Sequence, residues 1–529
     1  MSAPQVPAFP AGAGDAAAVR RRYLVLAAYL TFAVLAALAA ASLRIQANPI
    51  LALFVGSLVV LGWHRALLAW PALLGYVLAC VLFIPMRRFT LGGGLPVGLE
   101  PYRVLILLVL LGWVFALLAD PRTRWQKTRL DGPVIGFAVA VILSVVLNLR
   151  SILAQGITSE VLKQLSLFAG FFLVMYFAAS VLRDRRSLDR TLMFLVGGGA
   201  LVAISAIVES RTNLNVFNHV DRVIPILHSD AGGTLGGPPD RGGRARAFGS
   251  AEHPIALGAM LVLLMPIGIY LYRRRNQNLW LGAVLVLMLG ALSTGSRTAS
   301  LMLLAMGVAF LVMKRDEAVR MIPRLIPLLI VCQILMPGTV GTFKAILFPG
   351  KSGLIAEQQG GYGSGTGRVA DLAPSLREWS KSPFVGQGFG TRLTSESDPF
   401  INARILDNEW LGVLLEVGAI GFLSLIWLYA RAVRTLGRRA KQDASSYGWL
   451  LACLATAIAA FPVGMVTYDA FSFTQVTFVS FILVGLGSVA LRLGPEPDEV
   501  AAAAAAEAEA ARELDDRRGR TADVGFARA

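Results

Sequence analysis

Long runs of apolar residues constrain this chain more than any other feature. A helix needs about 17–25 apolar residues to cross the hydrocarbon core of a bilayer, and stretches such as 104–119, 255–272 and 471–491 approach or reach that length. Apolar residues fill these stretches continuously and do not alternate with polar ones on one face. Because lipid offers the backbone no hydrogen-bond partners, a helix is the expected form of each span.

The composition agrees with a membrane protein. Hydrophobic residues make up 56% of the 529, and charged residues only 16%, whereas a soluble chain carries roughly a quarter charged residues. We predict an all-α, polytopic integral membrane protein with about 14 transmembrane helices, within a range of roughly 12–14. The short second span could be re-entrant. The predicted spans are 23–43, 49–63, 67–86, 104–119, 132–148, 165–182, 191–208, 255–272, 279–295, 298–313, 323–337, 409–430, 447–466 and 471–491.

The basic short loops predict the orientation. Arg20, Arg21 and Arg22 precede the first span, which places the N-terminus inside, because cytoplasmic loops carry an excess of Lys and Arg. Alternation then puts both termini inside, with Arg87 and Arg88 as an exception that falls outside. The basic loops that alternation places inside are 120–131, 183–190, 273–278, 314–322 and 431–446.

The same alternation defines the organisation of the chain. Two long loops, 209–254 and 338–408, lie on the extracytoplasmic face, where a water-exposed function could be built. The other predicted segments are a disordered cytoplasmic N-terminus (1–22), N-terminal helices (23–208), central helices (255–337), C-terminal helices (409–492) and an Ala-rich cytoplasmic tail (493–529).

Several function classes lack support. The net charge of +16 follows from the basic inner loops meeting anionic lipid, and no nucleic-acid-binding pattern is present. The three cysteines lie in apolar spans and the four histidines are scattered, so we expect no metal. Gly350-Lys351-Ser352 resembles the end of a phosphate loop, but Ala345 stands where its first glycine belongs. We therefore expect no cofactor.

Polar residues gather instead at the outer ends of spans. Arg297 lies in the short Ser293–Thr298 connection between two spans, and Arg244 and Arg246 precede His253 and the next span. Guanidinium groups present a planar fork that fits phosphate oxygens. Arginines here could equally anchor the chain at the lipid interface. A further group comprises Arg377, Trp379, the glycines of 383–390, Asp407, Asn408 and Glu416.

The order of these groups resembles that of the O-antigen ligase and O-antigen polymerase superfamily. The shared pattern is SxGSRT at a span start, a long outer loop that contains PxxGxGxG, a polar pair with Asn, and a span with ExGxxG. The stretch from Arg246 to Gly258 is similar to the family's R-x-x-G-x-x-x-x-P-N block. The resemblance covers roughly 240–430; residues 1–200 match only as generic membrane helices.

The resemblance implies a metal-independent, inverting glycosyltransferase in a bacterial cytoplasmic membrane. Its donor would be an oligosaccharide linked to polyprenyl diphosphate, and its acceptor a glycan or a lipid. Chain-length-regulating and export proteins are further candidate partners. Arg246 and Arg297 would hold the diphosphate, with Arg244 able to substitute, while Arg377 would order the outer loop or bind another anion.

The sequence departs from the ligase pattern at one position. Ligases of this family carry His-Asn where this chain has Asp407-Asn408, which favours a polymerase-like member. Asp407 would be the catalytic base or orient the acceptor, although Asp407 or Asn408 could simply cap the next helix. We interpret His253 as a loop residue in preference to a catalytic base. Glu416 is a functional candidate inside a span, or else a helix–helix hydrogen bond.

Two alternatives remain open. One is ligase-type transfer of glycan to a lipid, wall or protein acceptor. The other is a flippase or another transporter, which would carry ionisable residues near the bilayer midplane. Because the candidate residues cluster at one face, we favour surface chemistry.

Overall fold

The computed structural model describes residues 68–91, 100–224, 227–229, 246–320, 371–393 and 406–499, with single residues at 323, 330 and 501. The chain divides into two compact units, Met1–Leu73 and Leu74–Ala529, and nearly all described residues belong to the second. The predicted spans 23–43 and 49–63, and nearly all of 323–337, lie outside the described residues.

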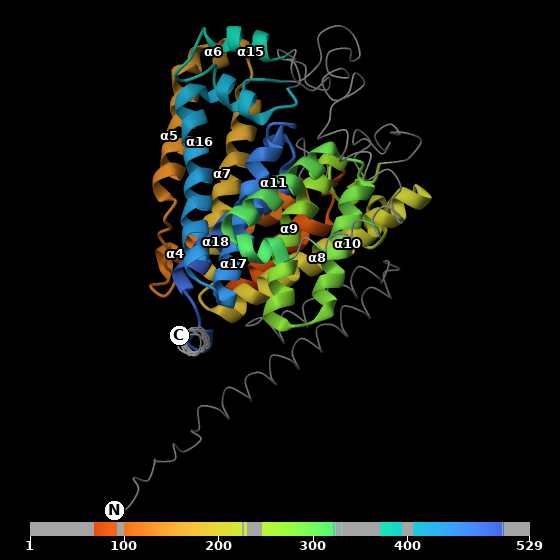
Figure 1. Ribbon diagram of the computed structural model, residues 1–529. Helices are drawn as coiled ribbons and strands as arrows, with labels where there is room; N and C mark the ends of the chain where they lie inside the picture. The colour runs from red at the N-terminus through yellow and green to blue at the C-terminus, as the bar shows by residue number, and fades with distance from the viewer. Residues whose placement is uncertain are drawn as a thin grey trace, which may run out of the picture. The chain divides into compact units, whose positions relative to one another are not determined.

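The described residues are overwhelmingly helical (Figure 1). A short antiparallel pair joins β1 (Phe89–Leu91) to β2 (Leu227–Ser229), and 3-10 turns form η1 (Val216–Arg222) and η2 (Ala470–Ser472). The α-helices are α3 (Trp70–Phe83), α4 (Pro101–Ala119), α5 (Asp131–Leu147), α6 (Leu149–Gln155), α7 (Thr158–Val181), α8 (Arg185–Thr212), α9 (Pro254–Arg275), α10 (Asn278–Ser293), α11 (Arg297–Met313), α15 (Leu372–Trp379), α16 (Glu409–Gln442), α17 (Ser446–Gly464) and α18 (Thr474–Leu493).

This is a multi-pass helical membrane protein. Within the described part of the chain, 7 helices are long and apolar enough to cross a membrane, or 8 if α5 and α6, which meet at a 58° bend, form one span. Three more apolar helices, α3, α10 and α11, are shorter. The fourteen spans stay a prediction, because the described helices account for only part of that number.

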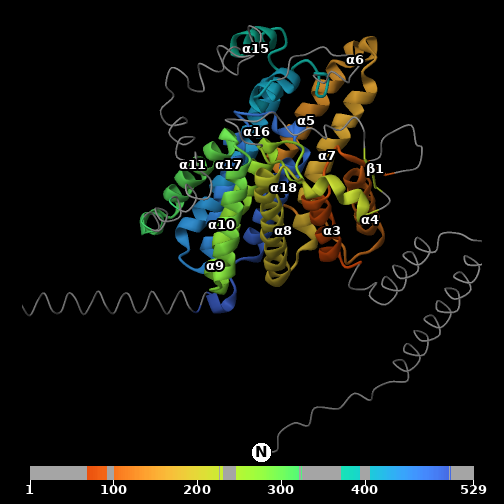
Figure 2. The same ribbon diagram turned by 90° about the vertical axis from the view of Figure 1, so that its right-hand side faces the viewer.

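The centre of the bundle is formed by α9, α17 and α18. The apolar windows of these helices are 83%, 83% and 78% buried, against 28% for α4. Each of the three packs on the other two, and Figure 2 shows α18 within the bundle beside α8 and α17. The surrounding helices expose large apolar side chains, as expected for surfaces that face lipid.

The helix ends form two groups. At one end, which we call the basic end, Arg274 pairs with Glu496 and Glu499, Arg431 donates to the carbonyl of Arg129, and Lys314 donates to that of Asp443. At the other end, the site end, Arg246 donates to the carbonyl of Thr294 and Asn148 to that of Gly386. Helices α6 and α15 lie at the site end, at the top of Figure 1. The loops predicted to lie inside therefore share one end.

Arg87 and Arg88, the exception to the charge rule, have structural partners at the site end. Arg88 is only 5% exposed. Its guanidinium donates to Asn218 Oδ1 (3.0 Å) and to the carbonyls of Gly249 (3.1 Å) and Ala251. Arg87 Nε lies 4.0 Å from Glu252 Oε1. Arginines held by such internal acceptors carry little information about orientation.

Helix α16 is interrupted at Gly418, whose φ of 70° and ψ of −170° suit only glycine. The segment Pro383–Gly388 fills the interruption. The N–H groups of Ala419 and Ile420 donate to the carbonyls of Pro383 and Phe384 at 2.9 and 3.2 Å. In return, the N–H groups of Gln387 and Gly388 donate to the carbonyls of Leu415 and Glu416 at 2.9 and 3.0 Å. The glycine motifs at 383–390 and 416–421 thus form one interlocked unit.

The interlock predicts a severe effect of Gly418→Ala. The new Cβ would collide with the carbonyl of Phe384, and the φ would be strained. We expect the free energy of unfolding to fall by about 2–4 kcal/mol, which would lower the thermal midpoint of the detergent-purified protein. The control is Gly307→Ala in α11, where a Cβ meets nothing within 4 Å. A Gly418→Ala protein as stable as this control would contradict the interlock.

Candidate functional site

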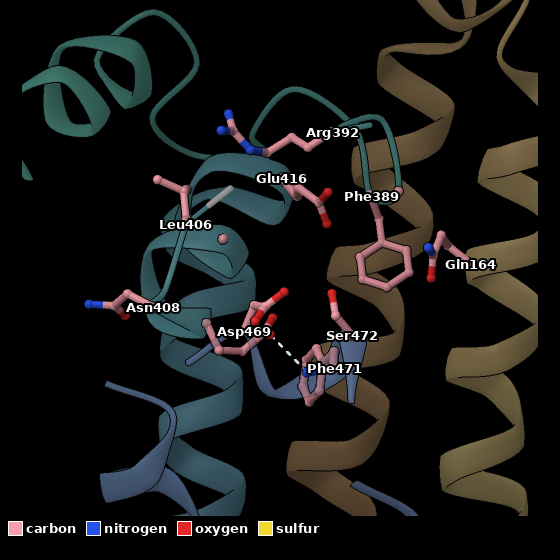
Figure 3. A pocket seen from close by; sticks show the side chains of 12 residues that line it. Gln164, Phe389, Arg392, Leu406, Asn408, Glu416, Asp469, Phe471 and Ser472 are labelled. Carbon is pink, nitrogen blue, oxygen red and sulfur yellow. Dashed lines mark hydrogen bonds between the residues drawn. The ribbon is translucent and has the colours of Figure 1, made fainter. Parts of the chain in front are cut away.

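A polar pocket lies at the site end of α16 (Figure 3). It is built from the first two turns of α16, the segment after the interlock, the connection between α17 and α18, and one residue of α7. Carboxylates of Glu409, Glu416 and Asp469 line it together with Arg392. The remaining lining residues are Gln164, Phe389, Gly390, Leu406, Asn408, Gly412, Phe471 and Ser472.

The first turn of α16 shows which polar residue is the cap. Asn408 has extended backbone angles, and its Oδ1 accepts the N–H of Leu411 at 3.3 Å. Asn408 is therefore the N-cap, and the neighbouring Asp407 is exposed. Glu409 is buried, and its Oε2 accepts the N–H of Phe471 at 2.8 Å. The carboxylate of Glu409 thus holds the α17–α18 connection against α16.

Glu416 points into the pocket beside Phe389 in Figure 3. It lies two turns after Glu409 and two residues before the break at Gly418, and the backbone of Gly390 and Arg392 lies close to its carboxyl group. The Arg392 guanidinium is also paired with Glu378 at 2.6 Å. Glu416 therefore ties α16 to the chain beyond the interlock.

Asp469 lies in the connection between α17 and α18, two of the three helices at the centre of the bundle. Burial raises the pKa of its carboxyl to about 6, and the nearby negative charge of Asp407 adds to that effect. The hydrogen bond with Ser472 acts in the opposite direction. Asp469 therefore titrates close to neutral pH, within the range useful for a proton acceptor.

The two predicted phosphate-binding segments lie against each other. Arg246 Nε donates to the carbonyl of Thr294 at 3.1 Å, and a Cβ on Gly295 would lie 3.7 Å from Arg246 Cγ. Arg297 is the first residue of α11, whose N-cap is Ser296. Arg244 lies outside the described residues.

His253 is a helix cap. Its Nδ1 accepts the N–H of Ile255 at 3.1 Å, and its ring stacks on Phe473 at a centroid distance of 5.4 Å. Burial, together with the positive charge of Arg246, lowers the pKa of the imidazole to about 4. The ring is therefore neutral at physiological pH, with Nδ1 occupied as an acceptor.

The connection 465–473 joins the arginine segments to the carboxylate pocket. Thr467 Oγ1 lies 2.8 Å from Thr298 Oγ1, next to Arg297. Glu252, next to His253, accepts the N–H of Thr474 at 3.1 Å. Between these two contacts, Asp469 and Phe471 of the connection line the pocket. Segments that are about 200 residues apart in sequence thus meet across one short connection.

Sequence reasoning missed part of this site. It did not single out Asp469 or Arg392 as site residues, and it considered Glu409 only as an alternative base if Asp407 is a cap, although an acidic residue in a short loop between two apolar spans was a visible signal at Asp469. Arg377, which was singled out, lies exposed on α15 and is not among the residues that line the pocket. Arg392 takes the position beside Glu416.

The described residues contain no group of three or more His, Cys, Asp or Glu side chains arranged to hold a metal ion. No family model matches the chain, and no curated protein matches it.

The pKa of Asp469 predicts a pH-dependent stability effect. The folded protein holds this proton more tightly than the unfolded chain, so the stabilisation is full below about pH 4 and is lost as the pH rises through about 6. We expect Asp469→Asn to be more stable than wild type at pH 7.5 by about 1–3 kcal/mol, and no more stable near pH 4. Thermal unfolding across this pH range measures the effect.

Asp316→Asn, which neutralises an exposed aspartate at the basic end, is the control. Its profile should follow that of the wild type. A pH-independent difference between Asp469→Asn and wild type would show that the buried charge of Asp469 is not the cause.

Proposed function

We propose that this protein is a glycosyltransferase that polymerises polyprenyl-diphosphate-linked oligosaccharide at the outer face of a bacterial cytoplasmic membrane. One observation carries the proposal: two arginine-bearing segments and a carboxylate pocket meet at the same end of the bundle across residues 465–473. A diphosphate donor needs positive groups, and a hydroxyl acceptor needs a base.

The donor end would be held by Arg246 and Arg297. As the bond from sugar C1 to the diphosphate oxygen breaks, negative charge grows on the departing polyprenyl diphosphate, and guanidinium groups stabilise it. Two arginines supply that charge in a reaction that needs no metal. The contact of Arg246 with the Thr294 carbonyl supports the pairing of the two segments.

The acceptor end would be served by Asp407. The acceptor hydroxyl attacks C1 from the face opposite the leaving group, its proton passes to the Asp407 carboxylate, and the new glycosidic bond has inverted configuration. Because Asn408 supplies the helix cap, capping does not account for Asp407. The proximity of Asp469, which responds to the charge of Asp407, makes Asp469 the second candidate for the base.

The remaining residues support this centre. Glu416, with Arg392, fixes the loop that borders the pocket, and His253 and Asn408 cap α9 and α16. Arg377 is proposed to bind a further anion on the outer loop, consistent with its exposure on α15.

The ligase alternative uses the same centre with a different acceptor. A purified protein given a lipid-diphosphate oligosaccharide would yield a ladder of products if it is a polymerase, and a single transfer product on an added acceptor if it is a ligase. A flippase would move the donor without forming any new glycosidic bond.

Chain-length-regulating and export proteins are proposed partners of the polymerase.

Arg297→Ala tests the donor site. Loss of a charge-assisted donor from the reacting centre should lower the transfer rate about 10²–10³-fold, while Arg297→Lys should restore it only in part, because a point charge lacks the planar fork. Arg222→Ala removes an exposed arginine at the same end and should be fully active. If Arg297→Ala matches this control, Arg297 is only an interfacial anchor.

Asp407→Asn tests the base. Removing a base costs about 10²–10⁴ in rate, whereas losing a cap costs about 1 kcal/mol of stability. We expect a stably folded protein that still binds the lipid donor and does not turn it over. Full turnover by Asp407→Asn would transfer the role to Asp469, which the matched Asp469→Asn variant then tests.

A further inference from the structure

A second cavity lies at the basic end, beside α5 and α16. It has a volume of about 580 Å³ and is lined by five arginines. Among the residues that the structure describes, no carboxylate lines this cavity, whereas Arg274 at the same end pairs with Glu496 and Glu499. The lining residues are Arg129, Trp427, Ala430, Arg431, Arg434, Thr435, Arg438, Arg439 and Gln442.

The cavity follows one face of α16. Trp427, Arg431, Arg434 and Arg438 succeed one another at intervals of four, three and four residues, so they form a stripe along the helix. All four are exposed. Arg431 is fixed in place, because its Nε donates to the carbonyl of Arg129 at 2.6 Å and its guanidinium lies 5.9 Å from the Trp427 ring.

The stripe begins where α16 passes from apolar to arginine-rich sequence, which is where a membrane helix is expected to leave the hydrocarbon core. Beyond the break at Gly418, α16 continues to Gln442, and a helical rise of about 1.5 Å per residue places Arg431 about 20 Å from Gly418. Tryptophan is enriched at this level of a membrane, where its ring meets both the acyl chains and the headgroups. Arg434 and Arg438 then reach into the headgroup layer itself.

Apolar side chains continue from the cavity toward the site end. Helices α5 and α16 pack side by side. On their outer faces, Ile135, Val139 and Ile142 of α5 are 60%, 47% and 57% exposed, and Leu423 of α16 is 62% exposed. A ligand in the cavity would therefore have a charged end among arginines and a path for hydrocarbon chains along α5 and α16.

We propose that this cavity binds an anionic phospholipid of the inner leaflet. The phosphodiester oxygens accept hydrogen bonds from Arg434 and Arg438, and the acyl chains lie over the exposed faces of α5 and α16. Guanidinium groups pair with phosphate oxygens in a planar fork, and basic pockets on the cytoplasmic side of membrane helices suit anionic headgroups. A zwitterionic lipid would bring a cationic group into a site whose described lining residues include no carboxylate to receive it. The site is independent of the proposed glycosyl transfer.

The test uses the full chain, purified in detergent and stripped of lipid. Native mass spectrometry would count bound lipids after addition of phosphatidylglycerol, cardiolipin, phosphatidylcholine or inorganic phosphate, and thermal unfolding would follow the same additions. We expect phosphatidylglycerol or cardiolipin to remain bound and to raise the thermal midpoint, while phosphatidylcholine and phosphate do neither. Equal effects of phosphate would identify an anion site and overturn the lipid proposal, as would equal retention of phosphatidylcholine.

The decisive variant is Arg434→Ala/Arg438→Ala. Its matched control is Arg315→Ala/Arg320→Ala, which removes two exposed arginines after α11 at the same end. We expect the first to weaken anionic-lipid binding at least 10-fold and the control to bind like wild type. The charge-preserving Arg434→Lys/Arg438→Lys should bind with intermediate affinity, which separates site chemistry from misfolding. Identical binding by the alanine variant and its control would refute the site.

Discussion

The interlock between the break in α16 and the segment Pro383–Gly388 is the constraint on which the site depends. Unpaired backbone groups inside a membrane protein are costly, so a broken helix persists only where other backbone groups replace the missing bonds. Here they do so in both directions. Asn148 of the α5–α6 bend also donates to the carbonyl of Gly386 at 3.1 Å, which anchors the segment from the other side. The same contacts fix Glu416 and bring Phe389 and Arg392 to the pocket wall.

The helices were predictable wherever apolar runs are continuous. The limits of α9, predicted as 255–272 and observed as Pro254–Arg275, differ by at most three residues. Predictions fell short where a helix continues into polar sequence. α16 reaches Gln442 and not 430, because arginine is a good helix former and the polar residues beyond the apolar run do not disturb helical hydrogen bonding. α7 likewise begins at Thr158, since its polar first turns need no lipid contact.

The candidate site was only partly predictable. Motif spacing singled out Arg246, Arg297 and Glu416, and the structure supplies the contacts that relate their segments to one another. The sequence alone could not distinguish Asp407 from Asn408 as the helix cap, because both side chains suit that position. The backbone angles in the structure identify Asn408 as the cap. The role of 465–473 was invisible, because this connection acts through contacts with residues far away in the chain. Glycines 386 and 418 were visible as a pattern, but their mutual close approach was not.

The tail segment at the basic end bears on the order in which the molecule is assembled. Glu499, with a side chain only 5% exposed, lies 2.9 Å from Arg274 and 3.8 Å from Arg185, the latter also nearly buried. These arginines belong to α8 and α9, which are synthesised more than two hundred residues earlier. Before Glu499 is synthesised, Asp189 of α8 is the acidic partner of both arginines among the contacts described, at 3.8 Å from Arg185 and 3.9 Å from Arg274, and a buried charge with incomplete pairing is costly. These contacts at the end of α8 and α9 can therefore form only after the residues that follow α18 have been synthesised.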